Sequence, residues 1–194
     1  MIIKHRVNSI EELRNIVPDL GVEVDLRSSG NDIICSHDPF VEADSFYEWI
    51  EKYDHKFLIA NIKSEGIEEE VFSILNKKKI CNFFFLDVSF PFMCKLRSMG
   101  ITDFAYRVSD LEEFNVDAFE WLECSWIWLD AFLQFPDKEI KKINNIISSK
   151  KICLVSPELH MIRDKEISKN ILKKINSSKL KFHAVCTKDP SQWI

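Results

Sequence analysis

Two histidines and two carboxylates near the start of the chain form the pattern with the most chemical potential. Glu23 and Asp25 lie in an alternating stretch at residues 21–26, and His5 and His37 each follow a short apolar run. Side chains two residues apart in a strand share a face, so we expect Glu23 and Asp25 to point the same way. Two carboxylates side by side are tolerated when both face a cation, which makes this stretch a candidate cation site.

Strands and helices must alternate along the chain to position these side chains. The first two strand-like runs are at residues 2–6 and 22–26, and six others begin near residues 57, 83, 104, 126, 152 and 182. A short strand at 33–35 follows a Ser-Ser-Gly-Asn turn. Helical segments are expected at 8–17, 43–53, 67–77, 93–99, 109–112, 138–148 and 164–176.

The eight strand-like runs are continuously apolar rather than alternating, apart from the carboxylate stretch. Such runs indicate strands that are covered on both faces, which is typical of parallel sheets. The fold class is therefore predicted to be α/β, as a small (β/α)8 TIM-like barrel in a single domain over residues 1–194. An open, doubly wound sheet is the alternative.

In either architecture, ligands bind beyond the carboxyl ends of the strands. The side chains placed around that mouth are His5, His37, Asn61, Lys63, Asp87, Ser89, Arg107, Asp130 and Glu158, with Glu23 and Asp25 inside it. Arg107 could clamp an anionic group. Asp130 could accept a hydrogen bond from a hydroxyl, and Trp128 could offer a stacking face, although core packing also explains Trp128. Glu158 and His160 lie on a loop that should face the mouth.

Composition narrows the classes of partner. The net charge of -5 disfavours nucleic acid, and no run of apolar residues is long enough to span a membrane, so no stable membrane association is expected. The first residues lack the features of a signal peptide, and the six cysteines are scattered without a Cys-x-x-Cys motif. We therefore expect a cytoplasmic protein with reduced thiols and neither a disulfide framework nor a cysteine zinc site.

The order of the motifs resembles the signature of the glycerophosphodiester phosphodiesterase family, within the phospholipase C-like barrel phosphodiesterases. The matching pieces are His-Arg at 5–6, Glu-x-Asp at 23–25, His-Asp at 37–38 and the lysine that ends the strand at 61–63. The last strand, at 185–190, reads like the family's closing motif. The rest of the chain matches only in its rhythm of strands and helices.

The resemblance implies a metal-dependent phosphodiesterase that acts on a small phosphodiester, glycerophosphodiester-like or linked to a sugar or nucleotide. Glu23, Asp25 and Asn61 match the positions that hold a divalent cation, Mg or Ca. His5 and His37 match the acid and base, and Lys63 matches the lysine that helps to hold the phosphate. We assign substrate binding to Arg6, Arg107, Asp130, Glu158 and His160.

Two residues depart from the family pattern. Val7 stands where the family usually has glycine after His-Arg, and Asn61 stands where it has a glutamate that binds the metal. An amide oxygen can coordinate a hard cation but brings no charge, so the cation would be held more weakly. Two alternatives stay open: a catalytically degenerate barrel that binds a phosphorylated ligand without turnover, and an open α/β enzyme whose motif match is accidental.

Overall fold

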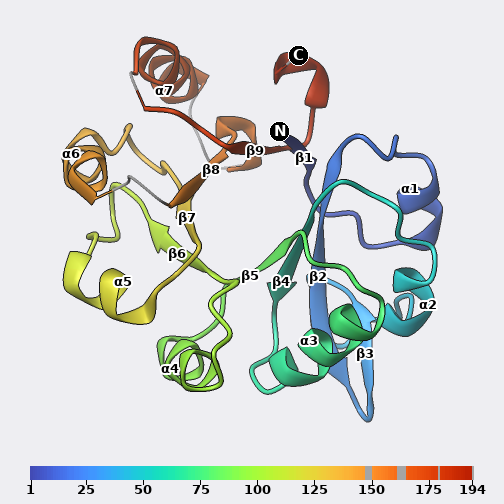
Figure 1. The fold of residues 1–194 in the computed structure, drawn as a ribbon. Coiled ribbons are helices and arrows are strands. Elements are labelled where there is room, and N and C mark those ends of the chain that lie inside the picture. The colour runs from blue at the N-terminus through green and yellow to red at the C-terminus, as the bar shows by residue number, and fades with distance from the viewer. Residues whose placement is uncertain (147–149, 161–164, 179, 194) are drawn as a thin grey trace.

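Eight parallel strands form a nearly closed barrel in the computed structural model, which describes residues 1–146, 150–160, 165–178 and 180–193 (Figure 1). The strands follow one another round the sheet in the order β5-β4-β2-β1-β9-β8-β7-β6. Their bounds are β1 Ile2–Lys4, β2 Gly21–Ser29, β4 Leu58–Ile62, β5 Phe83–Leu86, β6 Ala105–Val108, β7 Trp126–Leu129, β8 Lys151–Val155 and β9 Ala184–Thr187. The α/β class and the TIM-like barrel predicted from the sequence are confirmed.

Helices surround the strands on the outside of the barrel (Figure 1). They are α1 Ile10–Arg14, α2 Phe46–Ile50, α3 Glu68–Lys77, α4 Phe90–Ser98, α5 Val116–Leu122, α6 Asp137–Ile146 and α7 Lys165–Ser177, with short 3-10 turns η1 Pro157–Leu159 and η2 Pro190–Trp193. Residues 147, 148 and 164 of the predicted helices lie outside the described residues. No helix in the described part of the chain is both long and apolar enough to cross a bilayer.

The loosest seam of the barrel lies between β5 and β6. These two strands meet through a single parallel bridge between Phe85 and Phe104, supported by a 2.8 Å hydrogen bond from the amide of Phe85 to the carbonyl of Asp103. Every other neighbouring pair of barrel strands shares at least two paired positions. The ring therefore closes, with its weakest pairing at this seam.

The short strand predicted at 33–35 is present as β3, Asp32–Cys35, which pairs antiparallel with β2. Gly30 at the tip of this hairpin has φ +61°, a conformation that glycine adopts without strain. The hairpin stands outside the parallel ring and returns the chain toward the carboxyl end of β2. His37 follows β3 directly and is thereby brought back to that end of the barrel.

The apolar side chains form two cores, one on each face of the strands. Inside the barrel, Ile3, Ile59, Phe84 and Trp126 belong to one buried cluster. Outside it, a larger cluster joins the other face of the strands to the helices. Covering on both faces explains why the strands read as continuous apolar runs.

One helix was predicted in the wrong place. Residues 109–112 form a turn in which the hydroxyl of Ser109 accepts hydrogen bonds from the amides of Leu111 and Glu112. The helix begins later, at Val116, where the side chain of Asn115 accepts from the amide of Ala118. Serine competes for nearby backbone amides and thus favours a turn.

Candidate active site

A cavity of about 210 Å³ opens at the carboxyl ends of the strands. It collects ten of the eleven side chains that the sequence assigned to a site: His5, Arg6, Glu23, Asp25, His37, Asn61, Lys63, Arg107, Asp130 and His160. Ligand pockets for drug-sized molecules are usually larger, about 300–1,000 Å³. The cavity therefore suits a small ligand or one end of a larger one.

Glu158 is the predicted site residue that does not line the cavity. Its carboxylate accepts hydrogen bonds from the hydroxyl groups of Ser156 and Thr187 and from the amide of Lys188. These contacts fasten the loop after β8 to the end of β9. Glu158 thus has a structural partner for its charge beside the cavity rather than in it.

Buried carboxylates form the floor of the cavity. Glu23 and Asp25 are 0% and 1% exposed, respectively. In the register of the sheet Asp25 pairs with Asn61, so both lie in the same layer near the mouth, with Glu23 one layer deeper beside Ile59. The amide nitrogen of Asn61 lies 2.8 Å from Oε1 of Glu23 and 3.1 Å from Oδ1 of Asp25. The two carboxylates therefore converge on one point, as expected for residues that share a face.

Amide groups from the loop after β1 also hold the carboxylates. Arg6 has φ +58°, an uncommon conformation for a residue other than glycine, and its backbone amide donates to Oε2 of Glu23 over 2.6 Å. Asn8 donates its side-chain amide to Asp25 over 2.9 Å and accepts from the backbone amide of Asp25 at the same distance. The sequence suggested Asn8 or Ser9 as a helix cap, and the structure gives that role to Ser9. Asn8 is therefore a site residue that its helix-cap signal concealed.

Two positive side chains lie close to Asp25 but not to Glu23. The Nζ atom of Lys63 is 3.5 Å from Oδ1 of Asp25, and Nε of Arg6 is 3.6 Å from Oδ2. Burial, and then the neighbouring Asp25, raises the pKa of Glu23 to about 8. A buried carboxylate with no cation beside it resists ionisation, so this position favours an additional positive charge.

The donor set fits a hard divalent cation. Glu23 and Asp25 supply convergent oxygens, and Oδ1 of Asn61 is buried without a hydrogen-bond partner among the described residues. Rotation of the Asn61 amide would bring that oxygen beside the two carboxylates, where a cation would hold all three. Carboxylate and amide oxygens are the ligands that Mg²⁺ and Ca²⁺ take in proteins. No cluster of three histidine, cysteine, aspartate or glutamate residues with metal-binding geometry occurs in the described chain, because the third oxygen ligand here is an amide.

The two motif histidines line the same cavity but differ in environment. Burial, with a smaller contribution from Arg6, lowers the pKa of His5 to about 4, so its imidazole is neutral at neutral pH and able to accept a proton. The Nε2 atom of His5 lies 3.8 Å from Oε2 of Glu23. His37 contacts the carboxylate of Asp38 through Nδ1 at 2.8 Å, and its carbonyl accepts from Arg27 at the same distance.

Alternating charges continue round the mouth from β4 to β8. Lys63 contacts Asp25 and, at 2.8 Å, Asp87. Arg107 joins Asp87 to Asp130, whose Oδ2 lies 3.1 Å from Nη1. Since Oδ1 of Asp130 accepts from the amide of Ala131 and contacts the imidazole at position 160, both of its oxygens already have protein partners. Asp130 therefore fixes other side chains rather than offering a free acceptor for a substrate hydroxyl.

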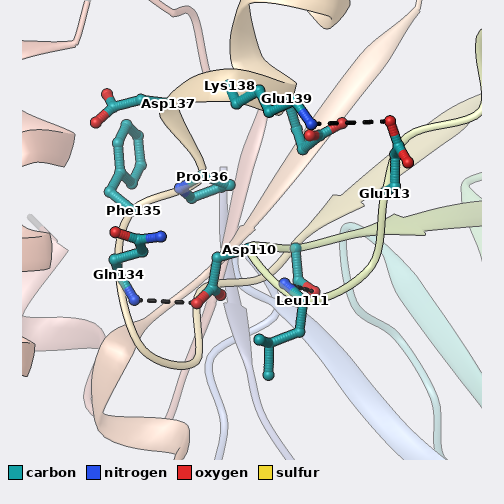
Figure 2. A pocket seen from close by; sticks show the side chains of 10 residues that line it. Asp110, Leu111, Glu113, Gln134, Phe135, Pro136, Asp137, Lys138 and Glu139 are labelled. Atoms are coloured by element: carbon teal, nitrogen blue, oxygen red, sulfur yellow. Dashed lines mark hydrogen bonds and ion pairs between the residues drawn. The ribbon is translucent and has the colours of Figure 1, made fainter.

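A second pocket, of about 350 Å³, lies between the loops that follow β6 and β7 (Figure 2). The carboxylate of Asp110 accepts there from the backbone amides of Phe132, Leu133 and Gln134, a contact that Figure 2 shows for Gln134. Its lining includes no histidine or arginine. The pocket orders the loop beside the candidate site and lacks acid–base groups of its own.

Comparison with family models, curated proteins and solved structures gives no match. The resemblance to the phosphodiesterases thus depends on the motif residues and on their arrangement in the barrel.

Proposed function

We propose that this chain is a phospholipase C-like barrel phosphodiesterase that cleaves a small phosphodiester, with His5 and His37 as the acid–base pair. The observation that carries the proposal is that both histidines line one small cavity with Glu23, Asp25 and Lys63. Residues far apart in the sequence meet in the arrangement that the family motif requires. The glycerophosphodiester-like substrate class rests on the resemblance alone.

The chemistry follows from the charge of the substrate. A phosphodiester is an anion, so attack on phosphorus requires positive groups that stabilise the added charge. Lys63, Arg6 and Arg107 supply fixed positive charge around the cavity. Glu23, Asp25 and Asn61 would hold a Mg²⁺ or Ca²⁺ ion, which when bound would polarise the phosphoryl oxygens.

Proton transfer falls to the histidines. His5, neutral and mostly buried, would accept the proton of the attacking oxygen, which belongs to water or to a hydroxyl group of the substrate. The leaving oxygen must gain a proton, and His37 is the motif residue for that step. Positioned acid–base groups of this kind contribute about 10²–10⁴-fold to a rate.

Hydrolysis of bis(p-nitrophenyl) phosphate with added Mg²⁺ or Ca²⁺ tests the proposal. We expect turnover by the wild type and a loss of about 10²–10⁴-fold in His5→Gln. His55→Gln is the matched control, because His55 precedes β4 and thus lies at the opposite end of the barrel from the cavity. Equal rates in wild type and His5→Gln, or no metal-dependent turnover at all, would refute catalysis at this site.

Binding without turnover is the second candidate function. It is favoured by Asn61, whose amide group lies between the carboxylates where the family has a third acidic ligand. In that case glycerol 3-phosphate should bind in calorimetric titrations, and Lys63→Gln should weaken its binding, while no diester is consumed.

A further inference from the structure

The cavity holds a third histidine, on the side opposite the paired carboxylates. Nε2 of His160 contacts Oδ1 of Asp130, the residue that follows β7. In the order of the barrel, β7 lies four strands from β2 in either direction. His160 and Asp130 therefore face Glu23 and Asp25 across the cavity.

The protein holds the imidazole of His160 firmly. Asp130 is 2% exposed, and its position is fixed by Nη1 of Arg107 at 3.1 Å and by the amide of Ala131 at 2.8 Å. The ring of Phe132 lies against the imidazole, with 4.6 Å between centroids. A buried carboxylate that orients an imidazole is the arrangement found in catalytic triads, where it fixes the tautomer and direction of the histidine.

His37, the motif acid, is held less firmly. Its side chain is 42% exposed, against 21% for His160, and its partner Asp38 is 76% exposed. Both His37 and Asp38 lie in a loop, so water competes for their hydrogen bonds. On geometry alone, His160 is the better-placed proton donor.

An unpartnered donor lies beside this pair. Trp128 lines the same cavity and is 4% exposed, and its indole Nε1 has no hydrogen-bond partner among the described residues. It is directly paired in register with Arg107 on β6. A buried donor without a partner costs about 1–3 kcal/mol, a cost that a ligand oxygen would remove.

We propose that His160, rather than His37, is the acid that protonates the leaving oxygen, and that the Trp128 N–H binds an oxygen of the departing alcohol. The inference rests on the proposed phosphodiesterase function. The attacking oxygen bonds to phosphorus and gives its proton to His5, while the bond from phosphorus to the leaving oxygen breaks. That oxygen keeps the bonding electron pair and takes a proton from Nδ1 of His160, because Nε2 is held by Asp130.

The test uses leaving groups of different basicity on one scaffold. Esters of glycerol 3-phosphate with p-nitrophenol, phenol and methanol are compared, with added Mg²⁺, in wild type, His160→Gln and the matched variant His37→Gln. A departing p-nitrophenolate needs no proton, whereas a methoxide does. We expect kcat/KM of His160→Gln to change little for the p-nitrophenyl ester and to fall about 10²–10⁴-fold for the methyl ester.

A merely structural role for His160 would lower the rate for all three esters by the same factor, which would overturn the inference. Selective loss on the methyl ester in His37→Gln, with none in His160→Gln, would overturn it equally. If the wild type cleaves none of the three, the proposed function itself fails. Trp128→Phe keeps the ring and loses the donor, so KM should rise, and an unchanged KM would remove Trp128 from the site.

Discussion

The amide nitrogen of Asn61 lies 2.8 Å from Oε1 of Glu23, although the two residues are 38 positions apart in the chain. Neighbouring parallel strands bring them together, since β2 and β4 are paired over five positions. This contact gives a buried carboxylate a hydrogen-bond donor but no positive charge. The electrostatic state of the whole site follows from that difference.

Replacing Asn61 with Asp should make folding more dependent on a cation. The variant loses both amide hydrogen bonds and places a third carboxyl group beside Glu23 and Asp25. Without added metal we expect a loss of about 1–3 kcal/mol in the free energy of unfolding, seen as a lower Tm. Added Ca²⁺ should raise the Tm of the variant more than that of the wild type, because the extra carboxylate supplies charge. An equal shift in both proteins would exclude Asn61 from the cation site.

Cation and anion should bind together in the wild type. The negative charges of Glu23 and Asp25 are matched in number by the positive charges of Arg6 and Lys63. A cation alone therefore adds net positive charge, which an anionic ligand would offset. Calorimetry should show tighter Ca²⁺ binding in the presence of glycerol 3-phosphate, and the reciprocal effect by linkage. Independent binding of the two would contradict this charge balance.

Asp87 should make stability depend on pH. Burial by itself would raise the pKa of Asp87, but Arg107 and Lys63 together bring it below its ordinary value. A lowered pKa in the folded state stabilises the protein above the pKa of the unfolded chain, about 3.9, and this contribution is lost as pH falls through the folded value. Asp87→Asn should therefore cost roughly 1–3 kcal/mol at pH 7.

The difference in Tm between wild type and Asp87→Asn should shrink as the pH is lowered below about 4. Asparagine suits this position as a control, because Asp87 has φ +58° and asparagine tolerates that conformation better than most residues. A difference in Tm that stays constant between pH 7 and pH 3 would show that the charge of Asp87 does not stabilise the fold.

The sequence predicted the barrel and most of the cavity because both depend on local patterns. Continuous apolar runs indicated parallel strands, and the carboxyl ends of parallel strands must meet, which collected His5, Lys63 and Arg107. The contacts within the cavity depend on side-chain partners that no spacing reveals. Asn8 reads as a helix cap but bonds to Asp25.

The structure also shows which charges are already paired. Asp130 was expected to accept a substrate hydroxyl, and Glu158 was expected at the mouth. Both carboxylates have protein donors on both oxygens. A sequence places a carboxylate at a strand end, but burial and the reach of neighbouring side chains decide whether it remains free.

Gly21 should be necessary for the alignment of β1 and β2. A Cβ atom at this position would lie 2.9 Å from Cγ1 of Ile3 and 3.1 Å from the carbonyl oxygen of Phe57. Gly21→Ala should therefore push the strands apart and cost about 1–3 kcal/mol, measured by urea unfolding. Gly30→Asn is the control, because nothing lies within 4 Å of the corresponding Cβ. Equal stability of Gly21→Ala and wild type would show that β1 can shift.

The most direct test of the account is a 31P NMR time course with a glycerophosphodiester, the protein and Mg²⁺ or Ca²⁺. The account predicts that the diester resonance declines as a monoester or a cyclic phosphate appears, that chelation stops the conversion, and that His5→Gln abolishes it. A diester resonance that stays constant with wild type and either cation, although the substrate is bound, would contradict phosphodiester cleavage at this site.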